Sequence, residues 1–184
     1  MKKLFLLTLA VIVYSTVAQG GIEFVGVDDV ATTYDSGSET LSMVDTAVIT
    51  VEYDDNTQFS IDPGSFSLIS YYDSGMLFTG GTFVFTDESG PPSVILSGNV
   101  LSIQFQEVFG YLAGSGQAEV LVSNLAGYPL GGSEIVSITF NLSPTFTDFT
   151  QDYTGGSLIN FIVPEPATLL LFGLGGLALR KRRK

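Results

Sequence analysis

Apolar and polar residues alternate along most of the chain between its two termini, and the segment LSIQFQE shows the alternation most clearly. There Leu101, Ile103 and Phe105 fall on one face of an extended chain, with Ser and Gln residues between them. Because successive side chains of a β-strand point to opposite faces, this pattern predicts a strand with one buried and one solvated face.

The same period of two recurs in the segment AVITVEY, where one predicted face holds Ala47, Ile49, Val51 and Tyr53. Helical periodicity is nearly absent between the termini, so we expect an all-β domain. Shorter runs predict further strands at Ile22 to Val27, Ser65 to Tyr71, Thr82 to Thr86, Val94 to Leu96, Gln117 to Ser123, Glu134 to Leu142 and Leu158 to Val163.

Between the predicted strands lie short segments rich in Gly, Asp, Asn, Ser and Pro, which are typical of turns. They include DDNT, DPGS, TGG, DESGPP, SGN, AGSG and DYTGGS. Many short antiparallel strands with such turns favour a β-sandwich of the jelly-roll or immunoglobulin-like kind, over residues 19–162. The core residues that we expect first are Phe66, Phe83, Phe85, Phe105, Ile138 and Phe140.

Residues 1–18 have the composition of a signal peptide. Lys2 and Lys3 precede an apolar run from Leu4 to Tyr14, and the small residues that end at Ala18 fit a cleavage site. An uncleaved membrane anchor is the alternative, but the apolar run is short for one. We therefore expect the segment to be removed during export.

The C-terminal residues 163–184 have three parts. Val163, Pro164, Glu165 and Pro166 come first, and an apolar run at 167–179 follows. The run predicts a transmembrane helix of about 20 Å, which is short for a hydrocarbon core of about 30 Å and could cross by thinning the bilayer or by recruiting Phe161 to Val163. The last five residues are all basic and predict a cytoplasmic stop-transfer signal; they are Arg180, Lys181, Arg182, Arg183 and Lys184.

Together, the Pro-Glu-Pro motif, the apolar run, the basic end and the N-terminal signal resemble the PEP-CTERM sorting domain. The resemblance implies processing by an exosortase, an integral-membrane enzyme similar to cysteine transpeptidases, in bacteria that have an outer membrane and make extracellular polysaccharide. It further implies an intermediate anchored in the inner membrane, a cut near Pro164 to Pro166, and transfer to the cell surface or extracellular matrix. A plain C-terminal anchor with an incidental Pro-Glu-Pro is the alternative.

Charge is distributed very unevenly. All seven basic residues are terminal, so residues 19–163 contain 18 Asp or Glu and no Lys, Arg or His. Such a surface repels nucleic acid and anionic lipid headgroups, and we expect neither as a partner of the outer domain. The chain has no cysteine, which excludes disulfides and thiolate metal sites.

The composition also argues against catalysis. Without His, Cys or Lys, residues 19–163 cannot form a catalytic triad, a thiolate nucleophile or a Schiff base. Two carboxylates could serve a glycosidase, and three adjacent pairs exist. Adjacent residues point to opposite faces of a strand, however, and in a turn they usually cap it, so we expect no enzyme. The pairs are Asp28 with Asp29, Asp54 with Asp55, and Asp87 with Glu88.

Two kinds of binding stay open. Asp54, Asp55 and Asn56 offer oxygen ligands for calcium, although their segment lacks the glycine and distant glutamate of an EF-hand loop and turn capping also explains them. Five tyrosines near predicted loops could form a sugar platform, or could equally cover the rim of the core, and the chain has no tryptophan. These tyrosines are Tyr71, Tyr72, Tyr111, Tyr128 and Tyr153.

The sequence therefore predicts an exported, non-enzymatic protein of the cell surface or extracellular matrix. Its expected partners are the export machinery, the exosortase and, before processing, the membrane. The alternative is a lectin-like module, with or without calcium, that binds extracellular polysaccharide.

Overall fold

The computed structural model describes residues 22–53, 56–73, 75–108, 111–125, 134–142 and 149–163. Within these residues the chain forms eight strands. The predicted signal peptide, the residues from Pro164 to the C-terminus, and Asp54 with Asp55 lie outside the described residues. The strands are β1 (Ile22–Asp35), β2 (Thr40–Tyr53), β3 (Gln58–Tyr72), β4 (Phe78–Asp87), β5 (Ser93–Val108), β6 (Tyr111–Ser123), β7 (Glu134–Leu142) and β8 (Tyr153–Ile162).

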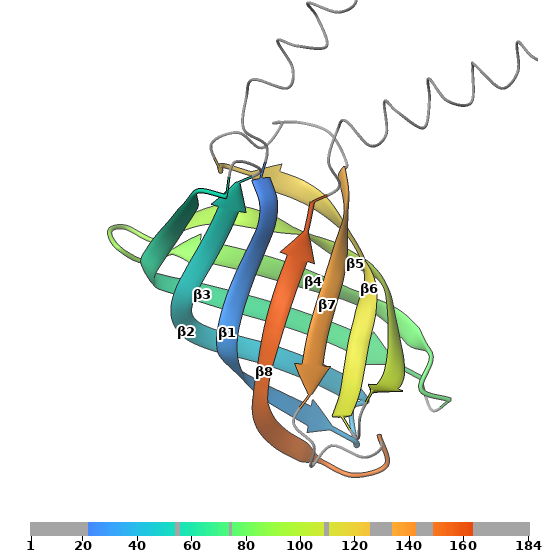
Figure 1. The fold of residues 1–184 in the computed structure, drawn as a ribbon. Helices are drawn as coiled ribbons and strands as arrows, with labels where there is room; N and C mark the ends of the chain where they lie inside the picture. The colour runs from blue at the N-terminus through green and yellow to red at the C-terminus, as the bar shows by residue number, and fades with distance from the viewer. Residues whose placement is uncertain are drawn as a thin grey trace, which may run out of the picture.

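The strands form one closed barrel, so the predicted sandwich is wrong. Each strand pairs antiparallel with the next in sequence, and β8 returns to pair with β1 from Phe24 opposite Ile162 to Tyr34 opposite Tyr153. This last pairing leaves no free sheet edge, whereas a sandwich would have open edges. In Figure 1, β3, β4 and β5 cross behind β1, β8 and β7, and the start of β1 lies at the same end as the finish of β8.

Several glycine-containing segments that predict turns lie inside strands instead. The segment SGN lies within β5, which merges the predicted strands at 94–96 and 101–107, and AGSG lies within β6. A Cβ on Gly98 would collide with the carbonyl oxygen of Glu119, and one on Gly116 with that of Ser102. These glycines therefore permit the close approach of β5 and β6 that the tightly curved barrel requires.

A register shift in β5 changes which residues of LSIQFQE face inward. The shift lies between Val100 and Ser102 in the pairing with β6. Val100 is buried while Leu101 is 45% exposed, so the prediction that Leu101 faces the core is wrong. An extra residue at a bulge reverses the inward and outward phase of the strand beyond it. After the bulge the predicted alternation returns, with Ile103 buried and Phe105 half-buried.

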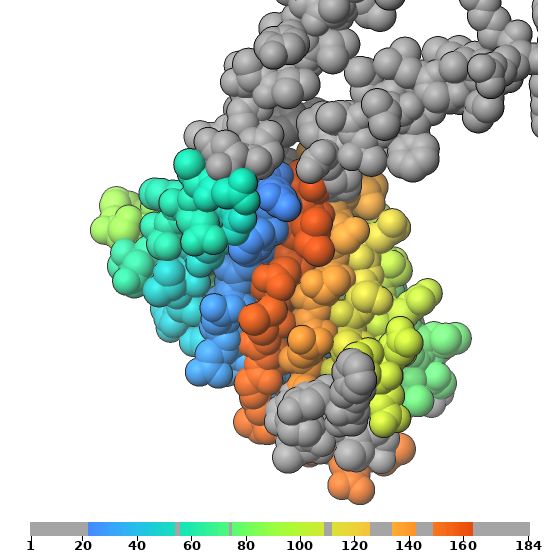
Figure 2. All heavy atoms as spheres, viewed as in Figure 1, coloured from blue at the N-terminus to red at the C-terminus, as the bar shows by residue number. Residues whose placement is uncertain are grey.

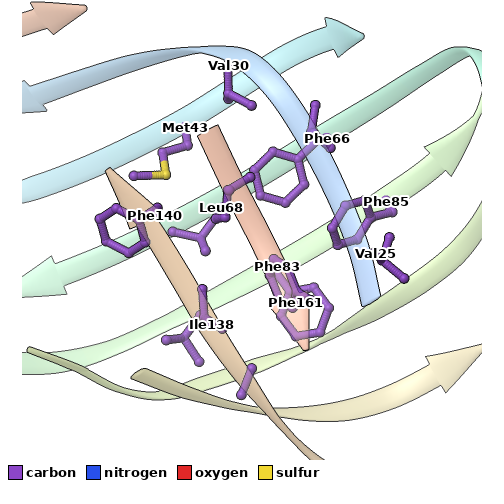
Figure 3. Packing of buried hydrophobic residues seen from close by; sticks show 14 of the residues in the cluster. Val25, Val30, Met43, Phe66, Leu68, Phe83, Phe85, Ile138, Phe140 and Phe161 are labelled. Atoms are coloured by element: carbon purple, nitrogen blue, oxygen red, sulfur yellow. The ribbon is translucent and has the colours of Figure 1, made fainter. Parts of the chain in front are cut away.

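The interior of the barrel is filled with aromatic and aliphatic side chains (Figure 3). Phe161 of β8 lies between the opposing strands, with its ring centroid 4.6 Å from that of Phe83 and 5.1 Å from that of Phe85. Phe66 of β3 adds a further contact to Phe85 at 4.7 Å. Five of the six expected core residues are buried, and the sixth, Phe105, is half-buried against the same cluster.

No helix within the described ranges is both long enough and apolar enough to cross a membrane. The predicted transmembrane helix at 167–179 falls in the part of the chain that the structure does not describe.

Candidate functional site

The last described residue of the chain, Val163, is hydrogen-bonded to the barrel. The backbone N–H of Val163, one residue beyond β8, donates a hydrogen bond of 2.9 Å to the carbonyl oxygen of Glu23 in β1. The next residue, Pro164, has no N–H with which to extend this ladder. The Val-Pro-Glu-Pro motif therefore begins at a residue that is itself hydrogen-bonded to β1.

The candidate calcium ligands are only partly described. The backbone N–H of Asn56 donates to the carbonyl oxygen of Tyr53 at 2.8 Å, and Asn56 has a positive φ of 62°. Both features are those of a tight turn. Among the described residues no group of three or more His, Cys, Asp or Glu is placed to hold a metal ion. Asp54 and Asp55 lie outside this search, so calcium binding there stays a prediction.

Several of the described carboxylates cap turns at the barrel ends. The Asp35 carboxylate accepts the backbone N–H groups of Gly37 and Ser38, and the bonds from Ser38 and then Gly37 lower the pKa of Asp35. The hydroxyl and N–H of Ser89 lower the pKa of Asp87 in the same way. A lowered pKa keeps a carboxyl group ionised, which is the opposite of what a general acid near neutral pH needs.

The structure describes the surroundings of three acids from the adjacent acidic pairs. Glu88 accepts a hydrogen bond of 2.8 Å from the Ser65 hydroxyl, while its neighbour Asp87 accepts from Ser89. Asp29 has a φ of 56° and lies where β1 shifts register against both neighbouring strands. Each of these acids thus has a local structural role.

Aromatic residues pack across the barrel end that is opposite the two termini. Phe149 lies 5.0 Å from Tyr34, 5.4 Å from Tyr72 and 4.6 Å from Phe105, measured between ring centroids. Burial raises the pKa of Tyr72 well above its usual value, and its hydroxyl lies 3.2 Å from that of Ser70. Asp152, which lies between Phe149 and β8, accepts hydrogen bonds from the N–H and the hydroxyl of Ser36.

Three of the five tyrosines considered for a sugar platform have described side chains. Tyr71 is 47% exposed on the outside of β3, whereas Tyr72 and Tyr153 are buried. Tyr128 and the side chain of Tyr111 are not described. The described tyrosines thus follow the alternative interpretation, in which most of them cover the core.

A different polar surface lies over β5, β6, β7 and β8. The register aligns its side chains in three rows across these strands, and we call this surface the amide face. Its outward residues are exposed or half-buried, and none carries a charge. The rows are Ser102, Gln117, Ser137 and Ile162; Gln104, Ser115, Thr139 and Asn160; and Gln106, Ala113, Asn141 and Leu158.

The amide face is missed by sequence reasoning because its members are spread from residue 102 to residue 162. The local signal is present, since Gln104 and Gln106 occupy polar positions of an alternating strand. Their proximity to Asn141 and Asn160 depends on strand order and register. Figure 2 shows β6, β7 and β8 side by side on the near side of the barrel.

Comparisons with known proteins identify the C-terminal segment. Residues 163–184 match the family model for the PEP-CTERM protein-sorting motif. Searches of curated proteins and of solved structures found no match. The sorting prediction is thus confirmed by a match that starts at Val163, the residue that joins the barrel to the motif. The chain thus carries a PEP-CTERM protein-sorting motif at residues 163–184, which supports export with a C-terminal membrane-anchored sorting signal, sorting by an exosortase, and delivery to the cell surface or the extracellular space.

Proposed function

We propose that the barrel is a non-enzymatic component of the cell surface or extracellular matrix, and that the exosortase removes the C-terminal segment during its delivery. The observation that carries the proposal is chemical: residues 19–163 contain no His, Lys, Arg or Cys. In addition, hydrogen bonds lower the pKa of three carboxyl groups at the barrel ends: Asp35 and Asp87 accept them from residues of their own turns, and Asp152 accepts them from Ser36. A structural protein needs neither a base nor a nucleophile.

Cell fractionation tests this proposal. Cells with an active exosortase should place the barrel on the surface or in the matrix, whereas exosortase-deficient cells should retain it in the membrane fraction. Purified processed protein should leave the polysaccharide of the same cells unhydrolysed. Hydrolysis that disappears when a single carboxylate is replaced would reject the non-enzymatic proposal.

A second candidate function is the binding of extracellular polysaccharide, and the amide face is the observation that favours it. Amide and hydroxyl groups can both donate and accept hydrogen bonds, as sugar hydroxyls do. The face carries three Gln and two Asn side chains over four neighbouring strands, namely Gln104, Gln106, Gln117, Asn141 and Asn160. An uncharged face suits a neutral glycan, because an acidic glycan would be repelled by the 18 carboxylates of residues 19–163.

Pull-down with the polysaccharide of the producing cells tests this second candidate. Retention of the processed protein should fall when Gln104 and Gln117 are replaced together by Ala, and should persist in Ser67→Ala, which alters the opposite side of the barrel. Repeating the assay with a calcium chelator separates direct binding from calcium-dependent binding. Equal retention of both variants would reject the amide face as the binding surface.

A further inference from the structure

The chain is paired within the barrel up to the first residue of the sorting motif. Ile162, at the end of β8, lies opposite Phe24 of β1 on one side and opposite Ser137 of β7 on the other. The backbone N–H of Val163 donates a hydrogen bond to the carbonyl oxygen of Glu23. The end of β8 is therefore held from both sides and offers no free sheet edge.

Very little chain separates this pairing from the membrane-anchored part of the signal. The apolar run begins at Ala167, so only residues 164–166 lie between it and Val163. Even when fully extended, the four steps from residue 163 to residue 167 span about 13 Å. An enzyme that cuts the chain outside the apolar run must therefore act within about 13 Å of the barrel.

The motif itself offers few main-chain donors to such an enzyme. Extended peptides are commonly recognised through their backbone N–H and C=O groups, but neither Pro164 nor Pro166 has an N–H. The remaining N–H groups of the motif are those of Glu165 and Val163, and the second is already donated to Glu23. A site that binds the chain on the N-terminal side of the motif thus competes with β1 for the same backbone groups.

The core limits how far β8 can open to supply these groups. Phe161 is fully buried, and its ring contacts those of Phe83 and Phe85 (Figure 3). Ile162 is exposed on the outside of the barrel, and Val163 is half-buried at the edge of the core. Separation of these last two residues from β1 leaves Phe161 in place, whereas one residue more would withdraw a core side chain.

From these observations we propose that the exosortase binds the main chain of Ile162 and Val163 together with the sorting motif, after these two residues have separated from β1. The inference rests on the proposed removal of the C-terminal segment by this enzyme. The opening lengthens the free chain between Phe161 and the apolar run to about 20 Å, while the buried Phe161 keeps the rest of the barrel closed. The strand pair that closes the barrel thus controls how readily the signal is processed.

A disulfide between β1 and β8 tests the proposal, because it prevents this separation. The hydrogen bond from Val163 to Glu23 makes the next pair, Phe24 and Ile162, a non-hydrogen-bonded one. The Cα atoms of such a pair lie about 4.5 Å apart, which suits a disulfide. The natural chain has no cysteine, so Phe24→Cys with Ile162→Cys can form only this bond within one chain.

The measurement is the rate at which cells with an active exosortase convert the labelled precursor to the processed form. The oxidised double variant should be converted at least tenfold more slowly than the same variant after reduction of its disulfide. Comparison of the two states of one variant removes any effect of the substitutions themselves. Intact mass verifies that the disulfide has formed.

The matched control is Thr40→Cys with Tyr71→Cys, on β2 and β3 at the opposite end of the barrel. The N–H of Tyr72 donates to the carbonyl oxygen of Glu39, so the pair next to them is also a non-hydrogen-bonded one. Each of the two pairs combines one exposed and one half-buried residue. The control disulfide should leave the rate of conversion unchanged.

A spacer distinguishes loss of access from any other effect of the disulfide. Insertion of about eight Gly and Ser residues between Val163 and Pro164 supplies flexible chain on the N-terminal side of the motif. With this spacer, the oxidised Phe24→Cys, Ile162→Cys variant should be processed at the wild-type rate.

Four results would overturn the proposal. They are equal conversion of the oxidised and reduced variant, equal slowing by the control disulfide, no recovery with the spacer, and failure of the disulfide between positions 24 and 162 to form, which would contradict the register. A wild-type precursor that stays unprocessed would instead reject the proposed function on which the inference rests.

Discussion

The two outer faces of the barrel share one scaffold but present different chemistry. The amide face over β5 to β8 carries amide and hydroxyl groups, with the exposed Leu158 and Ile162 on β8. A row of outward residues over β2 to β6, which we call the Val–Ser ladder, instead alternates valine and serine; it comprises Val44, Ser67, Val84, Ser97 and Val122. Neither set of residues includes a charge, although Glu119 lies within β6, a strand that contributes to both, and Asp35, Asp87 and Asp152 lie at strand ends and in loops. The difference teaches that strand order and register can place amide side chains on one side of a barrel and alternating valine and serine side chains on another.

The largest expected effect comes from the core that joins the two faces. Phe161 lies under the amide face and contacts Phe66, Phe83 and Phe85, which lie under the ladder. Phe161→Ala should lower the free energy of unfolding by about 3–5 kcal/mol, as is usual for loss of a buried phenylalanine. Urea denaturation measures this loss. Leu158→Ala, at an exposed position of the same strand, should cost far less, and equal losses would contradict the assigned core.

The next effect distinguishes strand glycines from loop glycines. Gly98→Ala and Gly116→Ala should each destabilise the barrel by roughly 1–3 kcal/mol, because the new methyl group collides with a backbone carbonyl of the paired strand. Gly90→Ala is the control, since a Cβ there meets no atom within 4 Å. If all three variants denature at the same urea concentration, the close pairing of β5 and β6 is not as described.

These glycines also mark where sequence reasoning failed. The local pattern predicted the bounds of β7 correctly, because no glycine interrupts Glu134–Leu142. It placed turns at Gly98 and Gly116, since glycine is common in turns and only the strand partner reveals a close backbone approach. The local pattern favoured a sandwich because it contains no sign of the pairing between Phe24 and Ile162, which closes the barrel and joins distant parts of the chain.

The sorting signal was predictable for the opposite reason. Its Pro-Glu-Pro motif, apolar run and basic end are consecutive in sequence, so no knowledge of strand register is needed to identify them. The amide face and the Val–Ser ladder depend on residues from several strands. Only the closed strand order brings Gln104 near Asn160, or Val44 into line with Val122.

A smaller effect would show which of the two faces binds polysaccharide. Removal of one amide hydrogen bond costs about 1 kcal/mol, so Gln104→Ala and Gln117→Ala should each weaken polysaccharide binding about fivefold. Val84→Asp should leave that binding unchanged. Titration of the processed protein with the polysaccharide measures the affinities. Weaker binding by Val84→Asp alone would assign polysaccharide binding to the Val–Ser ladder instead of the amide face.

Salt should produce a modest increase in melting temperature, because 18 carboxylates without a basic partner repel one another in the folded domain. Sodium chloride and calcium chloride at equal ionic strength should give equal shifts if screening is the only cause. An additional shift with millimolar calcium would instead identify a specific site, with Asp54 and Asp55 as the first candidates.

The smallest expected effect concerns the hydrogen bonds that Ser36 donates to Asp152, at the barrel end opposite the start of β1. Hydrogen bonds from the N–H and the hydroxyl of Ser36 lower the pKa of Asp152. A carboxyl group with a lowered folded-state pKa stabilises the protein above its unfolded pKa of about 4, and this contribution is lost as the pH falls through the folded-state value.

Asp152→Ala should therefore lower the melting temperature slightly at pH 7, and the difference should shrink below about pH 4. Glu107→Ala removes the same charge from an exposed strand position and controls for general repulsion. A difference between Asp152→Ala and wild type that grows on acidification would contradict the assigned cap.

The most direct test of the account is the intact mass of the protein extracted from the surface of cells with an active exosortase. The PEP-CTERM motif implies a cut near Pro164 to Pro166, and the predicted signal peptide ends at Ala18, so the processed chain should end near Pro164 to Pro166 and begin at Gln19. Exosortase-deficient cells should yield a heavier, membrane-bound form. A surface protein that still carries Arg180 to Lys184 would contradict the account.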